Sequence, residues 1–267
     1  PGGGDRPWPR LAENLVGGVP GVGQQFYGPE KNGFSWAFQI LPYLEENAVT
    51  GLNTEQQIAA TIIPIYNCPS RREPTKIGGD GNVMMDYASA NPRGIRRSGD
   101  DWVPYGFNDE ESFWQGGIFD ITGGKRYLGI IVRANAWPPE TKASRGNSKP
   151  TTTGQITDGM SKTMLVGEKR LTVDRYISGA WHDDRGWSDG WDPDCVRSTG
   201  FDLGIDLQRE ADAPDGIRIY GFNFGSAHRE GIHAVFGDGA VHRIGYDVDQ
   251  QVFDNMGDRR DGLNVVI

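Results

Sequence analysis

Three of the four histidines of the chain lie in one short segment, SAHREGIHAVFGDGAVHRI, at residues 226–244. Histidine and aspartate side chains bind metal ions and transfer protons, so this segment could carry chemistry. Asp238 and Gly239, however, form a dipeptide that favours a two-residue hairpin turn, because such a turn needs positive φ angles. His228 lies ten residues before Asp238, which along a strand corresponds to roughly 20 Å or more. We therefore expect the two side chains to share neither a metal ion nor a proton.

The other two histidines of the segment lie on the expected strands of the hairpin. A two-residue turn places Val235 opposite His242 and His233 opposite Ile244, so both imidazoles share one face of the sheet. Two imidazoles hold a metal ion only when carboxylates join them from elsewhere. The favoured interpretation is that both are half-buried polar side chains that hydrogen-bond to the backbone.

A second segment with chemical potential is WHDDRGWSDGWDPD, residues 181–194, which holds three tryptophans and five aspartates. Calcium binds several hard oxygen ligands from a flexible loop, although the spacing here is not that of an EF-hand. Calcium is the one cofactor that the sequence suggests, and otherwise we expect none. The candidate ligands are Asp183, Asp184, Asp189, Asp192 and Asp194.

The tryptophans of this segment allow two further interpretations. Trp181, Trp187 and Trp191 could form an exposed platform for sugar rings or for a neighbouring subunit. Alternatively, Trp181 and Trp187 belong to the hydrophobic core, and the aspartates serve turns and helix caps.

Cys68 and Cys195 are the only cysteines, and their spacing is not that of a zinc site. We favour a disulfide between them over two reduced core thiols. On the chain-entropy model, a bridge that closes so long a loop contributes about 4 kcal/mol. A disulfide would also place the protein outside the cytosol.

Enzyme signatures are absent from the sequence, and we expect no catalytic residues. There is no Gly-x-Ser-x-Gly motif, no phosphate-binding or dinucleotide-binding glycine loop, and no local activator for either cysteine. Glu168, with an aspartate of residues 181–194, is the only candidate carboxylate pair for glycoside cleavage. A hydrolase is thus the least favoured function.

The charge of the chain argues against nucleic acid as a partner. Its net charge is -9 and its isoelectric point is near 5.0, whereas phosphate binding needs clustered basic residues. The basic residues come in scattered pairs, interpreted as solvated loops: Arg71-Arg72, Arg96-Arg97 and Arg259-Arg260. No apolar run approaches the ~18 residues that a membrane span needs.

The order of elements predicts an α+β fold with a mainly antiparallel sheet, in one domain over residues 1–267. Residues 1–33 form an extended leading segment, residues 34–63 are helical, and residues 64–267 are rich in β-structure. Ser35 caps a helix that Pro42 interrupts, and Asn53 or Thr54 caps the next one. A C-terminal hairpin and a short helix at 247–257 close the chain. The expected strands lie at 63–69, 82–90, 116–121, 127–134, 163–171 and 176–181.

Four blocks in this order resemble a large planctomycete family of pilin-like proteins, long catalogued as a domain of unknown function. They are SWAFQILPYLEE (35–46), YNCPSR (66–71), ITDGMSKTMLVGEKR (156–170) and GSAHREGIHAVFGDGAVHRI (225–244). The last block holds the family signature, a histidine, nine residues and then Asp-Gly, here His228, Asp238 and Gly239. The resemblance covers about residues 35–267.

The resemblance implies a pilin-like fold, with short N-terminal helices packed on the sheet, and an exported protein. We expect a structural subunit of a pilin-like or pseudopilin-like filament or surface assembly, outside the cell, at its surface or in the periplasm. Its partners would be copies of itself or related subunits. Such families begin with a basic leader, a processing site and an apolar helix that contacts the membrane. This chain begins with PGGG, so we expect that helix to be absent from it. The alternative function is an extracellular module that binds glycan or protein through residues 181–194.

Overall fold

The described part of the chain opens with short helices. The computed structural model describes residues 34–77, 81–98, 100–104, 106–107, 113, 118–119, 125–132, 150–213 and 220–263. The predicted leading segment, residues 1–33, therefore lies outside the described residues. The helical part comprises α1 (Trp36–Gln39), the 3-10 helix η3 (Leu41–Leu44), α2 (Asn47–Thr50) and α3 (Glu55–Ala59).

Capping and proline chemistry explain these boundaries. The Ser35 hydroxyl accepts a hydrogen bond from the Phe38 N–H at the start of α1, and Thr54 does the same for Gln57 in α3. Pro42 lies in the first turn of η3, where its missing N–H costs nothing, so the predicted break occurs there. The predicted helical segment is thus confirmed as a series of single turns.

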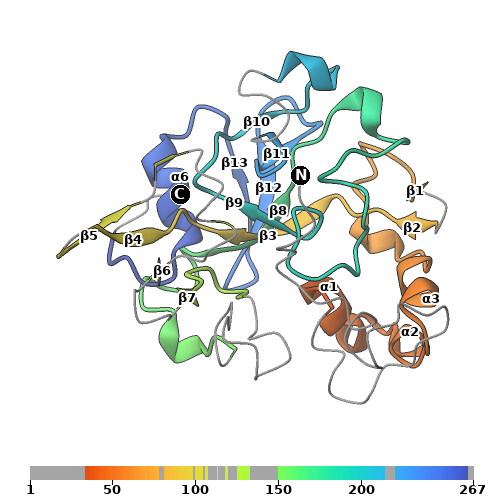
Figure 1. Cartoon of the computed structure of the whole chain (residues 1–267), viewed down its shortest axis with the longest axis horizontal. Coiled ribbons are helices and arrows are strands. Elements are labelled where there is room, and N and C mark those ends of the chain that lie inside the picture. The colour runs from red at the N-terminus through yellow and green to blue at the C-terminus, as the bar shows by residue number, and fades with distance from the viewer. Residues whose placement is uncertain are drawn as a thin grey trace.

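A five-stranded sheet forms the centre of the molecule (Figure 1), with strand order β13-β12-β8-β3-β9. The strands are β3 (Tyr87–Asn91), β8 (Met164–Glu168), β9 (Val196–Ser198), β12 (Ile232–Phe236) and β13 (Val241–Ile244). All neighbouring pairs are antiparallel except β3 and β9, which run parallel. The predicted α+β fold with a mainly antiparallel sheet is therefore confirmed.

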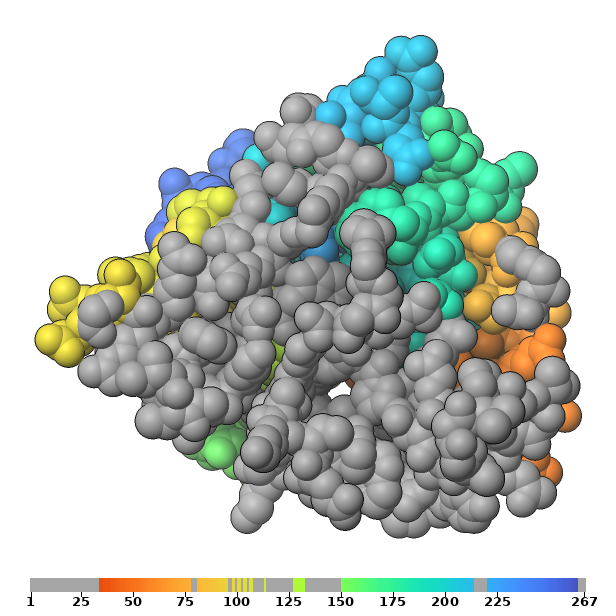
Figure 2. All heavy atoms as spheres, in the orientation of Figure 1, coloured from red at the N-terminus to blue at the C-terminus, as the bar shows by residue number. Residues whose placement is uncertain are grey.

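Three smaller sheets surround the central one. The largest has the order β5-β4-β6-β7, and two-stranded sheets pair β1 with β2 and β10 with β11. Figure 2 shows the β4–β5 pair (yellow) at the opposite end of the molecule from the helical segment (orange). The bounds are β1 Lys76–Ile77, β2 Asn82–Val83, β4 Ile95–Ser98, β5 Asp101–Pro104, β6 Ile118–Phe119, β7 Lys125–Arg126, β10 Gly204–Ile205 and β11 Gly225–Ser226.

Two of the expected strands are wrong, and the described part of a third has no strand. Residues 63–69 form the 3-10 helix η4 (Pro64–Tyr66), because Pro64 at its first position fixes a helical φ. Residues 176–181 follow the 3-10 helix η6 (Val173–Arg175) as turns. Residues 127–132 are irregular. The remaining 3-10 helices are η5 (Thr153–Gln155) and η7 (Glu210–Asp212).

Two hydrophobic clusters hold the fold together. The first joins the N-terminal helices to the segment 181–194, with Phe38, Leu41 and Trp187 among its buried side chains. The second lies beneath the C-terminal helix α6 (Gln250–Gly257), where Phe253 packs edge-on against Phe224. The helix predicted at 247–257 is thereby confirmed.

The C-terminal hairpin has a three-residue loop rather than the predicted two-residue turn. The Phe236 N–H donates to the Ala240 carbonyl, and Gly239 has a φ of 86° that favours glycine. As a result Ala234 lies opposite His242, and His233 lies opposite Arg243. The expectation that His233 and His242 share a face is therefore wrong, because a shift of one residue moves a side chain to the other face.

Candidate functional site

Cys68 follows η4 in a loop that a buried carboxylate fixes in place. Its backbone N–H donates to Oδ2 of Asp86 at 2.8 Å. The other oxygen of Asp86 accepts a hydrogen bond from Nε of Arg72, also at 2.8 Å, and the Asp86 N–H donates to the Tyr66 carbonyl. These contacts hold the Cys68 loop against the start of β3.

Glu168 is the last residue of β8, between β3 and β12, and its side chain is almost completely buried. Its Oε2 atom accepts a hydrogen bond from the His233 backbone N–H at 2.8 Å, and Nδ1 of His233 lies 3.4 Å from the same oxygen. Because Oε2 is engaged on the β12 side, the Oε1 atom is left to face the Cys68 loop.

His228 lies in the loop between β11 and β12. Its N–H donates to the Ser226 hydroxyl at 3.1 Å, and its carbonyl accepts a hydrogen bond from the Tyr246 hydroxyl at 2.6 Å. These two bonds fix the backbone, while the imidazole keeps 32% of its surface exposed to solvent. His228 is therefore held by the fold and remains accessible from outside.

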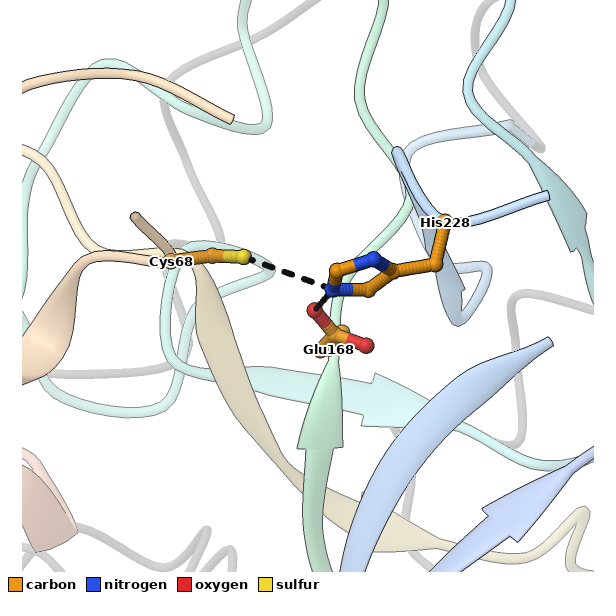
Figure 3. A group of neighbouring side chains, drawn as sticks. All are labelled: Cys68, Glu168 and His228. Carbon is orange, nitrogen blue, oxygen red and sulfur yellow. Dashed lines mark hydrogen bonds and ion pairs between the residues drawn. The ribbon is translucent and has the colours of Figure 1, made fainter. Parts of the chain in front are cut away.

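The three side chains converge on one point (Figure 3). Nε2 of His228 lies 3.7 Å from Sγ of Cys68 and 3.4 Å from Oε1 of Glu168. The three ligand atoms all lie within 4.8 Å of one another, and no other such group of His, Cys, Asp or Glu occurs in the described part of the chain. Each residue comes from a different one of the four blocks quoted above.

This arrangement suits ligation better than nucleophilic catalysis. A cysteine–histidine nucleophile needs its orienting acid on the second ring nitrogen, whereas Glu168 contacts the same Nε2 atom of His228 that faces Cys68. Burial, and then the neighbouring Glu168 carboxylate, raise the pKa of the Cys68 thiol against the opposing effects of the Ser70 N–H and Arg71. Sulfur, nitrogen and oxygen atoms that face one point are a typical metal-ligand set.

Sequence reasoning missed this group because its members are far apart in the chain. Cys68 and His228 are separated by 160 positions, whereas the motif itself suggests only Asp238 as a partner for His228. The available signal was that Cys68, Glu168 and His228 each belong to a block of the family resemblance.

Asp238 and Gly239 serve the hairpin, as expected. Oδ1 of Asp238 accepts a hydrogen bond from the Ala240 N–H at 2.9 Å, and the Asp238 N–H donates to the Met160 carbonyl. Strand β12 lies between Asp238 and His228, and the two side chains have different partners. The two ends of the signature therefore have separate roles.

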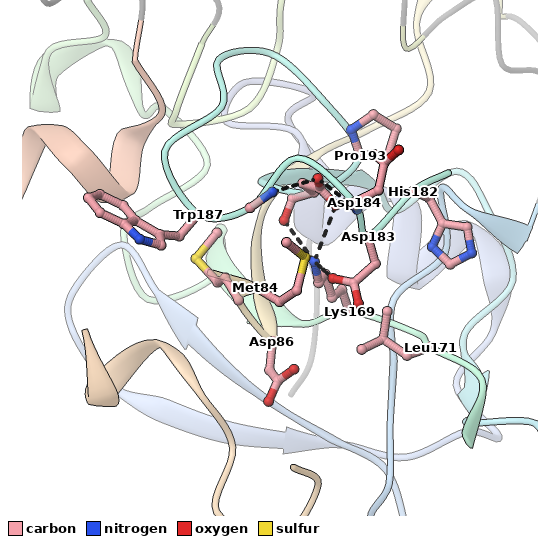
Figure 4. A network of polar contacts seen from close by, with 12 residues as sticks. Met84, Asp86, Lys169, Leu171, His182, Asp183, Asp184, Trp187 and Pro193 are labelled. Atoms are coloured by element: carbon pink, nitrogen blue, oxygen red, sulfur yellow. Dashed lines mark hydrogen bonds and ion pairs between the residues drawn. The ribbon is translucent and has the colours of Figure 1, made fainter. Parts of the chain in front are cut away.

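Two of the five candidate calcium ligands, Asp183 and Asp194, have buried partners inside the fold, and Figure 4 shows Asp183 beside Lys169. The Asp183 carboxylate binds Arg72 at 2.6 and 3.1 Å and Nζ of Lys169 at 2.7 Å. Although burial opposes ionisation, the charges of Arg72 and Lys169 hold the pKa of Asp183 well below its usual range. Burial raises the pKa of Asp194 to about 6 against the charge of Lys169, and its carboxylate accepts the N–H groups of residues 184–186.

The other three aspartates have local roles in the same segment. Oδ1 of Asp189 accepts from the Gly190 N–H, and Oδ1 of Asp192 accepts from the Asp194 N–H at 2.9 Å. Asp184 is exposed beside Arg185. The calcium site stays a prediction, with Asp183 already neutralised by two cations.

Two of the basic pairs interpreted as solvated loops contribute buried arginines. Arg71 and Arg72 are both buried, with Nε of Arg71 3.0 Å from Oδ2 of Asp206. Arg259 is also buried, and its Nη1 donates to the carbonyls of Tyr127 and Gly129. The interpretation as solvated loops is wrong for these three residues, because each guanidinium finds a carboxylate or carbonyl partner inside the fold. The Arg96 and Arg97 side chains lie outside the described residues.

The predicted tryptophan platform is wrong, because two of its three residues are buried. Trp187 is fully buried and its indole N–H donates to the Thr61 carbonyl. Trp191 is buried against Tyr127. Trp181 alone is partly exposed, at 38%, where its ring meets Phe222 edge-on.

The predicted disulfide between Cys68 and Cys195 is also wrong, because each buried thiol has a different partner. Cys195 Sγ contacts the Trp187 carbonyl at 3.3 Å, and Cys68 Sγ faces His228. The carboxylates suggested as a hydrolase pair have separate ion-pair partners within the described residues. Glu168 faces His228, whereas the next residue, Lys169, faces the aspartates of the segment 181–194.

We expect two free thiols in each chain. After unfolding in denaturant without reductant, a thiol reagent should label two cysteines, and the intact mass should be unchanged by prior reduction. A chain that gains two hydrogens on reduction and shows no free thiols beforehand would contradict this assignment.

The sequence model of one family, described as a protein of unknown function (DUF1559), matches residues 19–251. Neither the search of curated proteins nor the search of solved structures gave a significant match. The matched range includes all four blocks and all three residues of the Cys68–Glu168–His228 group.

Proposed function

Because the chain belongs to the family of proteins of unknown function (DUF1559), we propose that it is a non-enzymatic structural subunit of an exported, pilin-like surface assembly. The observation that carries the proposal is the order of the four family blocks within the matched range. The short helices beside a mainly antiparallel sheet are compatible with that role.

The proposed partners are copies of the chain or related subunits, at the cell surface, outside the cell or in the periplasm. The chain is acidic, with a net charge of -9, which favours solubility in water for the proposed head group. Within the described residues, no helix has the length and apolar character to cross a bilayer.

Electron microscopy of native material tests the proposal. Gold-labelled antibody against this chain should decorate regular filaments or a surface lattice on cells that produce it, and cells without the chain should lack both label and structure. If the chain is recovered only as a dispersed monomer, with no label on any surface structure, the assembly role is wrong.

A further inference from the structure

We propose that Cys68, Glu168 and His228 bind one zinc ion through Sγ, Oε1 and Nε2. Zinc accepts thiolate, imidazole and carboxylate ligands in one tetrahedral site, whereas calcium prefers oxygen ligands alone. A cysteine sulfur in the group favours a borderline-soft transition metal over calcium or magnesium. The proposal goes beyond the assembly role and does not depend on it.

Two of the three separations between the ligand atoms match the edges of a tetrahedral zinc site, and the third, between Cys68 Sγ and Glu168 Oε1, is at most 4.8 Å. Zinc lies about 2.3 Å from sulfur and about 2.0–2.1 Å from nitrogen or oxygen, so tetrahedral edges are about 3.6 Å for S···N and about 3.4 Å for N···O. The observed distances are 3.7 Å between Cys68 Sγ and His228 Nε2 and 3.4 Å between His228 Nε2 and Glu168 Oε1. His228 Nε2 therefore already lies at ligand spacing from both of the other ligand atoms.

The charge of Glu168 gives a second reason for a cation. A carboxylate that is almost completely buried needs a positive partner, and the ion-pair contacts of Glu168 within the described residues are to two histidines. The nearby cationic side chains serve other carboxylates: Arg71 contacts Asp206, and Lys169 contacts Asp183. A zinc ion would neutralise Glu168 and the Cys68 thiolate together.

The surroundings of the group hold its ligands in place, as in other metal sites. The His233 N–H occupies Oε2 of Glu168 and so turns Oε1 toward the other two residues. The Cys68 backbone is fixed by Asp86, and the His228 backbone by the Tyr246 hydroxyl. The partly exposed His228 ring gives access from solvent. Three protein ligands leave a fourth position for water or an external ligand.

Zinc binding by the full chain tests the proposal. The chain is kept reduced and titrated with Zn²⁺ in competition with a chromophoric chelator, and Co²⁺ is used as a spectroscopic probe. We expect one tightly bound Zn²⁺ per chain and a thiolate-to-cobalt charge-transfer band. His228→Ala should weaken Zn²⁺ binding at least 100-fold, and Cys68→Ala should remove the band. His242→Ala is the matched control, since His242 lies on β13 with its ring beside Phe236 and outside the proposed site, and this variant should bind Zn²⁺ as the unmodified chain does.

Circular dichroism establishes that each variant is folded, and His228→Ala is the decisive one because its ring is partly exposed. The proposal is overturned if the unmodified chain binds no stoichiometric Zn²⁺. It is equally overturned if folded His228→Ala binds Zn²⁺ as tightly as His242→Ala, or if the cobalt complex lacks the thiolate band.

Discussion

Replacing Asp183 by asparagine is expected to lower the free energy of unfolding by about 3–5 kcal/mol, the usual cost of removing one partner from a buried ion pair. The side chains of Asp183, Arg72 and Lys169 are all buried. The neutral amide leaves Arg72 and Lys169 with less compensating charge, and the carboxylate that remains beside Lys169 within the described residues is that of Asp194, 3.8 Å away. Urea denaturation at pH 7 measures the loss.

The same substitution should change the acid sensitivity of the fold. The folded pKa of Asp183 lies below its unfolded value of about 3.9, so its stabilising contribution is present above that pH and is lost as the pH falls. The stability difference between the unmodified chain and Asp183→Asn should therefore shrink below about pH 4. The exposed neighbour provides the control, because Asp184→Asn should change stability by less than about 0.5 kcal/mol. A cost for Asp183→Asn as small as that of the control would contradict the buried network.

Truncating Trp187 to alanine is expected to cost about 3–5 kcal/mol, because it opens a cavity in the core. The indole packs between Phe38 and Tyr66, and its N–H satisfies the Thr61 carbonyl. Trp187→Phe should cost less, since a ring remains to fill part of the space. Urea denaturation followed by far-ultraviolet circular dichroism avoids dependence on tryptophan fluorescence.

The partly exposed Trp181 supplies the comparison for this prediction, and Trp181→Ala should destabilise the chain much less than Trp187→Ala. A large loss of stability for Trp187→Ala and a small one for Trp181→Ala would assign Trp187 to the core and not to a surface platform. If Trp187→Ala left stability unchanged and abolished binding of a sugar, the assignment of Trp187 to the core would be wrong.

Local rules predicted the elements that depend on neighbouring residues. Ser35 and Thr54 cap helices as their side chains require, and Pro42 divides the first helical segment. The hairpin was predicted from Asp238-Gly239, yet its loop has three residues, because the dipeptide alone does not fix loop length. Because of that one-residue difference, His242 lies on the opposite face of the sheet from the expected one.

Contacts between distant segments determine which polar side chains are buried and which of them meet, and local rules do not predict these contacts. The arginines of YNCPSRR gave no local sign of burial, and besides Asp86 their partners include Asp206 and Asp183, more than a hundred residues away. The Cys68–Glu168–His228 group depends on the pairing of β8 with β3 and β12. No periodicity or spacing in the sequence predicts that these three side chains lie together, although each of them belongs to a block of the family resemblance.

Anomalous diffraction at the zinc absorption edge, from crystals grown with Zn²⁺ under reducing conditions, tests the central claim that these three blocks build one metal site. We expect one peak about 2.0–2.3 Å from Cys68 Sγ, Glu168 Oε1 and His228 Nε2. A map without a peak there, or with its peak among the aspartates of residues 181–194, would contradict it.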